Sequence, residues 1–177
     1  MVLTDSGTAF RQSVLLNRGA RDGILDGWAT MDGLGLVGRI SGVGERTSRV
    51  MLLTDPSSRL PVSILPSGQH ALLTGDNTQL PALDFIERPE EVRPGDRVVS
   101  SGDGGLFPPG LPVGQVALAS DGRLRVRMAA DYGRLEFLRV LRSHEAEPIP
   151  DGGSVIPPAD APAMMGPPQP EAGAALQ

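Results

Sequence analysis

Hydrophobic residues come along the chain in short runs of four to eight, separated by Gly, Pro, Asp or Asn. Runs of this length between turn residues are typical of β-strands, whereas helices need longer runs with a 3.6-residue period. The sequence therefore predicts an all-β fold, with strands at Gln12–Asn17, Trp28–Met31, Leu36–Ser41, Arg49–Thr54, Leu60–Leu65, His70–Thr74, Leu83–Glu87, Arg97–Ser101, Val113–Ala119, Arg123–Met128 and Leu135–Leu141.

The run Arg123–Met128 alternates strictly between arginine and apolar residues. Period-two alternation predicts a strand with one face in the core and the other outside. Arg123, Arg125 and Arg127 would then share the outer face, either solvated or in contact with an acidic partner or lipid headgroups.

Two segments, Ile24–Ile40 and Val92–Val116, look like copies of one another. Each reads as a turn glycine, a strand, a glycine-rich connection and a strand with a central glycine. The turn glycines are Gly27 and Gly95, and the central ones are Gly38 and Gly114. Because a glycine inside a strand usually marks a bend or a close backbone approach, all four are predicted to be structural. The repeat predicts two related β units.

Charge divides the chain at Arg142. All 16 basic residues are arginines, and residues 1–142 also hold 16 of the 21 acids, so the five excess acids follow Arg142. A neutral folded part has no field that would attract nucleic acid, and we expect no such partner. Residues 143–177 are rich in Pro, Ala and Gly, which predicts a disordered acidic tail.

Chemical motifs are few. The chain has no cysteine, and its acids are scattered through turns, so we predict no metal site. Gly33 to Gly38 matches the dinucleotide motif G-x-G-x-x-G, which requires a strand before it and a helix after it. The residues that follow read as a strand, so we predict no cofactor site. No run of about 18 apolar residues occurs, which predicts no transmembrane helix in this chain.

A hydrolase is the main enzymatic alternative. Two small barrels would suit a chymotrypsin-like protease. His70 could then act as the general base for a nucleophilic Ser100 or Ser101, and Asp76 or Asp84 could orient His70. The segment Ser101–Gly105 lacks a serine between its aspartate and its glycine pair, so we predict no catalytic residues. A peptidoglycan-binding module is a further alternative.

A proline-stiffened loop carries Leu106, Phe107 and Pro108. Rigid apolar groups on a loop lose little entropy on docking, which makes these residues candidates for partner binding. The competing interpretation is that Phe107 folds back to plug a barrel.

Several segments in order resemble the MreC family of rod shape-determining proteins, from Val14 to Leu141. They are Asn17–Ile24, Gly35–Ile40, Ser48–Val62, Gly95–Gly102 and, most specifically, Gly104–Gly114. The resemblance implies two small six-stranded β-barrels, distantly like the chymotrypsin double barrel. The expected division is 8–68 with 121–142 for the first barrel, 69–120 for an inserted second barrel, and 143–177 for the tail.

The resemblance also implies a non-enzymatic scaffold of the elongation complex that maintains cell shape. Its barrels would lie in the periplasm, tethered to the inner membrane by a helix and coiled coil that precede them. The implied partners are a class B penicillin-binding transpeptidase, other copies of the protein, and the MreB, MreD and RodA machinery. The family has no catalytic residues or cofactors to carry over.

Overall fold

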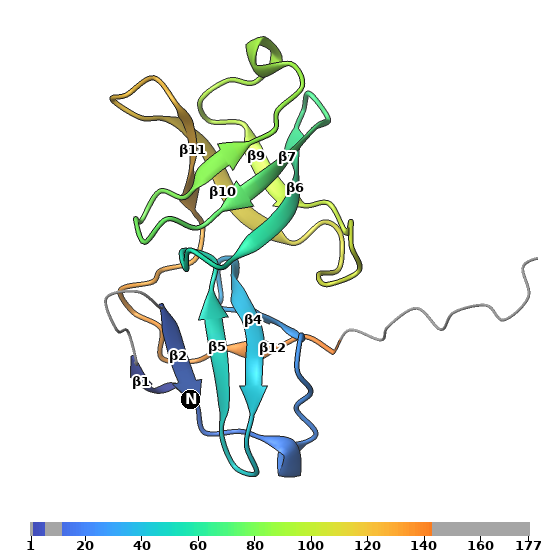
Figure 1. Ribbon diagram of the computed structural model, residues 1–177, viewed down its shortest axis with the longest axis vertical. Helices are drawn as coiled ribbons and strands as arrows, with labels where there is room; N and C mark the ends of the chain where they lie inside the picture. The colour runs from blue at the N-terminus through green and yellow to red at the C-terminus, as the bar shows by residue number, and fades with distance from the viewer. Residues whose placement is uncertain (1, 6–11, 143–177) are drawn as a thin grey trace, which may run out of the picture. The chain divides into compact units, whose positions relative to one another are not determined.

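The computed structural model describes residues 2–5 and 12–142 (Figure 1). The strands are β1 (Val2–Asp5), β2 (Ser13–Leu16), β3 (Ala29–Met31), β4 (Leu36–Val43), β5 (Ser48–Leu52), β6 (Arg59–Leu65), β7 (Gln69–Thr74), β8 (Ala82–Asp84), β9 (Arg97–Ser100), β10 (Pro112–Leu118), β11 (Leu124–Met128) and β12 (Arg139–Val140). Two short 3-10 helices, η1 (Ala20–Asp22) and η2 (Pro89–Glu91), lie between them. The all-β prediction is confirmed. Among the described residues, no helix has the length and apolarity needed to cross a membrane.

Six strands form a closed antiparallel barrel in the order β10-β11-β8-β7-β6-β9. The pairing of β9 with β10 completes the circle. The barrel is filled by branched aliphatic side chains, among them Val62, Ile64, Val98, Val113 and Val126, each at most 1% exposed. Alternation of these residues with outward-facing ones explains why each run forms a strand with one buried face.

The other six strands form an open sheet in the order β1-β2-β5-β4-β3-β12. Val14, Val37, Ile40 and Val50 are buried on its inner face. The segment after β11 crosses this face, where the Tyr132 hydroxyl donates to the carbonyl of Val37 at 2.9 Å. Burial raises the pKa of Tyr132, and the nearby Asp32 carboxylate adds to the effect. The phenol is therefore neutral and serves as a hydrogen-bond donor.

Two details of the predicted architecture are corrected. First, only one of the two units is a closed barrel, because the edge strands β1 and β12 do not pair with each other. Second, β6 and β11 belong to the closed barrel, although the expected ranges 8–68 and 121–142 assigned them to the other unit. The reason is that β6 pairs with β7 and β9, and β11 with β10 and β8. The tail expected at 143–177 lies outside the described residues, and the likeness to chymotrypsin stays a prediction.

The two copies of the sequence repeat form hairpins with equivalent hydrogen bonds. Gly27 N–H donates to the carbonyl of Ile40 at 2.9 Å, and Gly95 N–H donates to that of Val116 at 2.8 Å. Both glycines have positive φ, +82° and +95°. In the second strand of each hairpin, a Cβ on Gly38 would lie 2.0 Å from the Met51 carbonyl oxygen, and one on Gly114 would lie 2.1 Å from that of Arg127. Neighbouring strands approach too closely there for any side chain.

Candidate interaction surface

The loop between β9 and β10 is closed at its base by Ser100. The buried Ser100 hydroxyl donates to the carbonyl of Pro108 at 2.6 Å and accepts from the N–H of Leu111 at 2.9 Å. This closure folds the loop inward, and Phe107 is 4% exposed within the barrel core. This burial agrees with the plug interpretation, and Phe107 is not exposed as a partner-binding residue would be. Of the other two candidate residues in this loop, Pro108 is half-buried and Leu106 is exposed.

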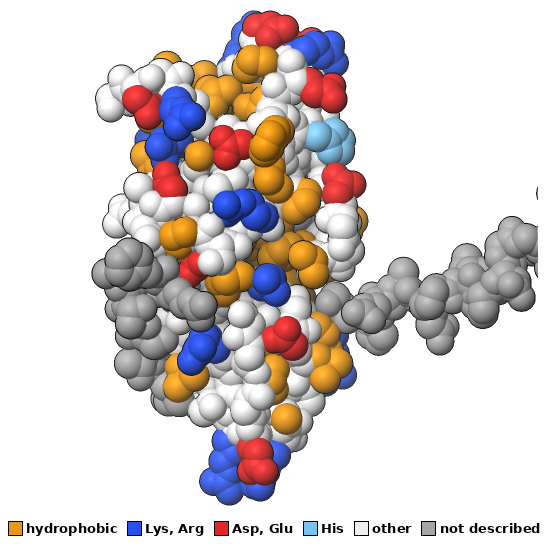
Figure 2. Space-filling model, in the orientation of Figure 1, with side chains coloured by type: hydrophobic (Ala, Val, Ile, Leu, Met, Phe, Trp, Pro, Cys, Tyr) orange, Lys and Arg blue, Asp and Glu red, His pale blue; other side chains and the backbone are white. Residues whose placement is uncertain are grey.

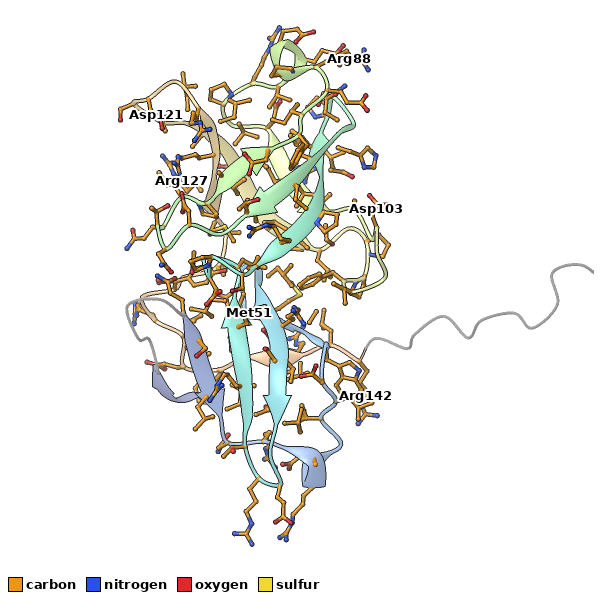
Figure 3. The ribbon with its side chains drawn as sticks, in the orientation of Figure 1. Met51, Arg88, Asp103, Asp121, Arg127 and Arg142 are labelled. Atoms are coloured by element: carbon orange, nitrogen blue, oxygen red, sulfur yellow. The ribbon has the colours of Figure 1, made fainter. Side chains whose placement is uncertain are left out.

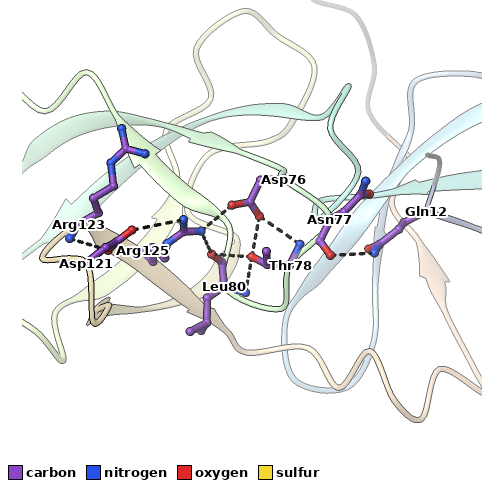
Figure 4. Close-up of polar contacts among 8 residues, drawn as sticks. All are labelled: Gln12, Asp76, Asn77, Thr78, Leu80, Asp121, Arg123 and Arg125. Atoms are coloured by element: carbon purple, nitrogen blue, oxygen red, sulfur yellow. Dashed lines mark hydrogen bonds and ion pairs between the residues drawn. The ribbon is translucent and has the colours of Figure 1, made fainter. Parts of the chain in front are cut away.

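The prediction that three arginines of β11 share an exposed face is corrected at one position, Arg125. Arg125 is largely buried, and its guanidinium donates to the Asp76 carboxylate at 2.6 Å and to the carbonyl of Leu80 at 2.7 Å (Figure 4). The hydrogen bond to Asp76 raises the pKa of Arg125. Partial burial would raise the pKa of Asp76, but hydrogen bonds from Thr78 and Arg125 outweigh it and lower that pKa. Arg125 therefore anchors the β7–β8 loop to β11.

Arg123 and Arg127 remain exposed, as the alternation predicts. They do not join the β9–β10 loop in one surface, because Arg127 and the loop residue Asp103 lie on opposite sides of the barrel (Figure 3). The sequence could not reveal this separation, since it depends on the order of strands around the barrel.

A shallow groove of about 330 Å³ lies on the outer face of β10. Gln115 and Ala117 line its floor, Pro94 and Gly95 stand on one side, and Arg127 stands on the other. Gln115 is the register partner of both Arg127 on β11 and Arg97 on β9, so two arginines flank the floor. Leu118, 59% exposed, lies at its end. The groove thus combines small apolar surface with positive charge.

Phe85 is an exposed aromatic that the sequence prediction missed. It follows β8, is 82% exposed and has a φ of +59°. Alternation after the buried Leu83 would send Phe85 inward, but the left-handed residue breaks the alternation and Ile86 packs against the core instead. The signal was present, because two adjacent apolar residues cannot both face the core of a regular strand.

The surface carries no large field of a single charge on the face shown in Figure 2, where basic, acidic and apolar side chains are interspersed. Large apolar side chains that are exposed on the closed barrel include Phe85, Leu106 and Leu118. A binding surface on this unit would therefore use individual apolar anchors with charged neighbours.

The residues of the hydrolase alternative are not assembled as that chemistry requires. His70 Nδ1 lies 3.4 Å from Asp103, and the Ser101 hydroxyl donates to the same carboxylate at 2.7 Å, so the acid stands beside the serine. The Ser100 hydroxyl donates a hydrogen bond to a carbonyl of its own loop, and the Asp76 carboxylate forms an ion pair with Arg125. The Gly33–Gly38 motif leads into strand β4, where a dinucleotide site would need a helix. Among the described residues, no three His, Cys, Asp or Glu side chains cluster as metal ligands would.

Residues 2–142 match the family model of the rod shape-determining protein MreC, barrel core. The chain belongs to the MreC family. A cell shape-determining protein MreC from Cereibacter sphaeroides is 73% identical over 161 residues, which cover 90% of this chain and 54% of that protein. The predicted family resemblance is confirmed.

Solved structures of the family share the fold. The crystal structure of MreC from Pseudomonas aeruginosa has a TM-score of 0.73 at 28% identity and covers 80% of this chain and 96% of that one. A complex between penicillin-binding protein PBP2 and MreC from Helicobacter pylori has a TM-score of 0.57 at 20% identity and covers 72% of this chain and 85% of that one. The chain spans about half the length of the curated relatives it matches.

Proposed function

We propose that this chain is the periplasmic scaffold part of a cell shape-determining protein, and that it acts by binding proteins and catalyses no reaction. Its partners are a class B penicillin-binding transpeptidase and other copies of itself, within a complex that includes MreB, MreD and RodA. A membrane helix in the longer protein tethers it to the inner membrane. The observation that carries the proposal is the family match across residues 2–142.

Two further observations support the transpeptidase as a partner. The Helicobacter pylori family member has been solved with PBP2, and its fold is similar to that of this chain. The closed barrel also presents separate apolar side chains to solvent, including Phe85 and Leu118. Anchors of this kind supply most of the free energy of a protein interface when a partner buries them.

The proposal is tested by measuring binding of the full chain to the immobilised periplasmic part of the class B transpeptidase from the same bacterium. We expect saturable binding with a Kd in the micromolar range or below, unchanged when the active-site serine of the transpeptidase is acylated by a β-lactam. A matched soluble penicillin-binding protein of another class is the control. Equal binding to both proteins, or none to either, would overturn the proposal.

Two parallel assays separate this function from its alternatives. Co-sedimentation with purified peptidoglycan would identify a wall-polymer module. Labelling by a serine-reactive probe, lost in Ser101→Ala, would identify a hydrolase, since Ser101 is the serine next to Asp103. We expect neither signal.

A further inference from the structure

The most unusual exposed residue of the closed barrel is Phe85. A non-glycine residue at positive φ is disfavoured by contacts of its Cβ, and bulky residues are rarely found there. Here the φ of +59° keeps an aromatic ring 82% exposed while its neighbour Ile86 fills the core. A regular strand would have buried one of the two and avoided the unfavourable dihedral. Strained backbone of this kind is concentrated at sites that bind or react.

The groove on β10 has the properties that an aromatic side chain requires. Its volume of about 330 Å³ is at the lower end of the range for small binding sites. Ala117 and Pro94 provide apolar surface, and Arg127 also lines the groove, where a guanidinium can attract the face of an aromatic ring. Arg127 forms no ion pair with the described residues, so its charge is available.

Charges around the two features are complementary. Asp84 precedes Phe85 and Glu87 follows it by two residues, and neither forms a salt bridge within the described part of the chain, although the charge of Asp84 also acts on Arg125. The groove is flanked by Arg97 and Arg127 through their register with Gln115. Opposite charges around a docking anchor fix its orientation and raise its association rate.

We propose that Phe85 of one copy of this chain inserts into the β10 groove of a second copy. The inference rests on the self-association included in the proposed function and identifies the contact that produces it. Because the anchor and the groove are different patches of one barrel, the contact is head-to-tail. A head-to-tail contact generates a ring if its rotation closes, and an open chain of copies otherwise. An open chain then keeps one free groove at one end and one free Phe85 at the other.

The test uses two variants that each remove one half of the contact. Phe85→Gly removes the ring while allowing the same φ, so the backbone should be kept. Ala117→Trp fills the groove from its floor, on the outer face of β10. Phe137→Ala, at an exposed aromatic near β12, is the matched control.

Sedimentation velocity of the full chain from 10 μM to 500 μM gives the readout. The wild type and Phe137→Ala should associate with increasing concentration, and each of the other two variants alone should associate at least tenfold more weakly. An equimolar mixture of Phe85→Gly and Ala117→Trp should form a one-to-one complex and grow no further, because only one intact contact can form. The melting temperature of Phe85→Gly should be equal to or higher than that of the wild type.

Several outcomes would overturn the inference. A wild type that stays monomeric throughout would contradict the self-association in the proposed function itself. Association that is unchanged in Phe85→Gly would place self-association on another surface. Loss of transpeptidase binding in Phe85→Gly with self-association intact would assign Phe85 to the transpeptidase. Failure of the mixture to form the one-to-one complex would exclude the groove as the receptor for Phe85.

Discussion

The closed barrel and the open sheet are built on the same plan and differ at one place. The hairpin β3–β4 corresponds to β9–β10, with matching turn glycines, matching central glycines and equivalent hydrogen bonds. Continuing outward, β5 corresponds to β11, β2 to β8, β12 to β6, and β1 to β7. In the barrel, β7 pairs with both β6 and β8, whereas in the sheet β1 pairs with β2 alone.

The difference shows that a shared hairpin does not determine closure. The strand that completes the barrel, β6, has seven residues and pairs with β7 at six positions. Its counterpart β12 has two residues and pairs only with β3. The sheet therefore keeps an open edge at β12, where the barrel has the longer strand β6 paired on both sides. The same supersecondary unit is thus found in a closed barrel and in an open sheet, and the difference lies in the strands that flank it.

Phe107→Ala should have the largest effect and should act on the barrel. Removing a buried phenyl ring from a core usually lowers the free energy of unfolding by about 3–5 kcal/mol, through lost burial and the remaining cavity. Chemical denaturation followed by circular dichroism measures the change. Phe137→Ala, at a residue 71% exposed beside β12 of the sheet, should change stability by less than about 0.5 kcal/mol. Equal effects of the two variants would contradict the assignment of Phe107 to the core.

Substitution of the two central glycines by valine should lower the stability of the closed barrel more than that of the open sheet. At Gly114 the new side chain must force β10 from β11, and a closed barrel has no free edge toward which strands can move. We expect a loss of about 3 kcal/mol or more there, and about 1–3 kcal/mol for Gly38→Val in the open sheet. Thermal melts of both variants give the comparison.

Gly33→Val is the control for these substitutions. A Cβ at Gly33 meets no atom within 4 Å, so this variant should melt within a few degrees of the wild type. A larger loss at Gly38 than at Gly114 would show that closure does not limit relaxation of the strands.

The sequence predicted local structure well because local structure depends on nearby residues. Alternation located β11, and the repeat located both hairpins and the glycines at their turns. The strand expected at Leu83–Glu87 ends instead at Asp84, because Phe85 adopts a left-handed conformation. The adjacent apolar pair Phe85 and Ile86 indicates that one of the two is exposed, but a single sequence has no reliable signal for the positive φ that decides which one.

The site was predicted less well because exposure depends on long-range packing. Phe107 is buried through Ser100, a hydroxyl whose bonds to Pro108 and Leu111 form only when the loop closes. Arg125 forms an ion pair with Asp76, which lies 49 residues away in sequence. Alternation gave the correct face for Arg125 but could not show that an acid from another loop would reach it.

Alanine at the turn glycines should affect the two units alike. Gly27 and Gly95 have positive φ and open space around the position of a Cβ, so the effect comes from the backbone alone. Each substitution should lower the free energy of unfolding by about 1 kcal/mol. Urea denaturation of the single variants and of the double variant measures it, and the double loss should be additive. A much larger loss at one position would show that the two hairpins are not equivalent.

Titration of Asp76 should have the smallest effect on stability. It allows a polar contact of the barrel to be compared with one of the sheet. The pKa of Asp76 is lowered in the fold, so its carboxylate stabilises the barrel above the unfolded value of about 3.9 and loses that effect as the pH falls through the folded pKa. Asp76→Asn should therefore be less stable than the wild type at pH 7, by less than about 1 kcal/mol because the pair is partly solvated. Urea denaturation from pH 7 to pH 2 should show this difference shrinking below pH 4. In the sheet unit, the Gly19 N–H and Arg18 lower the pKa of the exposed Asp22, and Asp22→Asn should follow the same trend with a smaller amplitude. A difference at Asp76 that persists unchanged at pH 2 would show that the Asn variant is destabilised by packing and not by the lost charge.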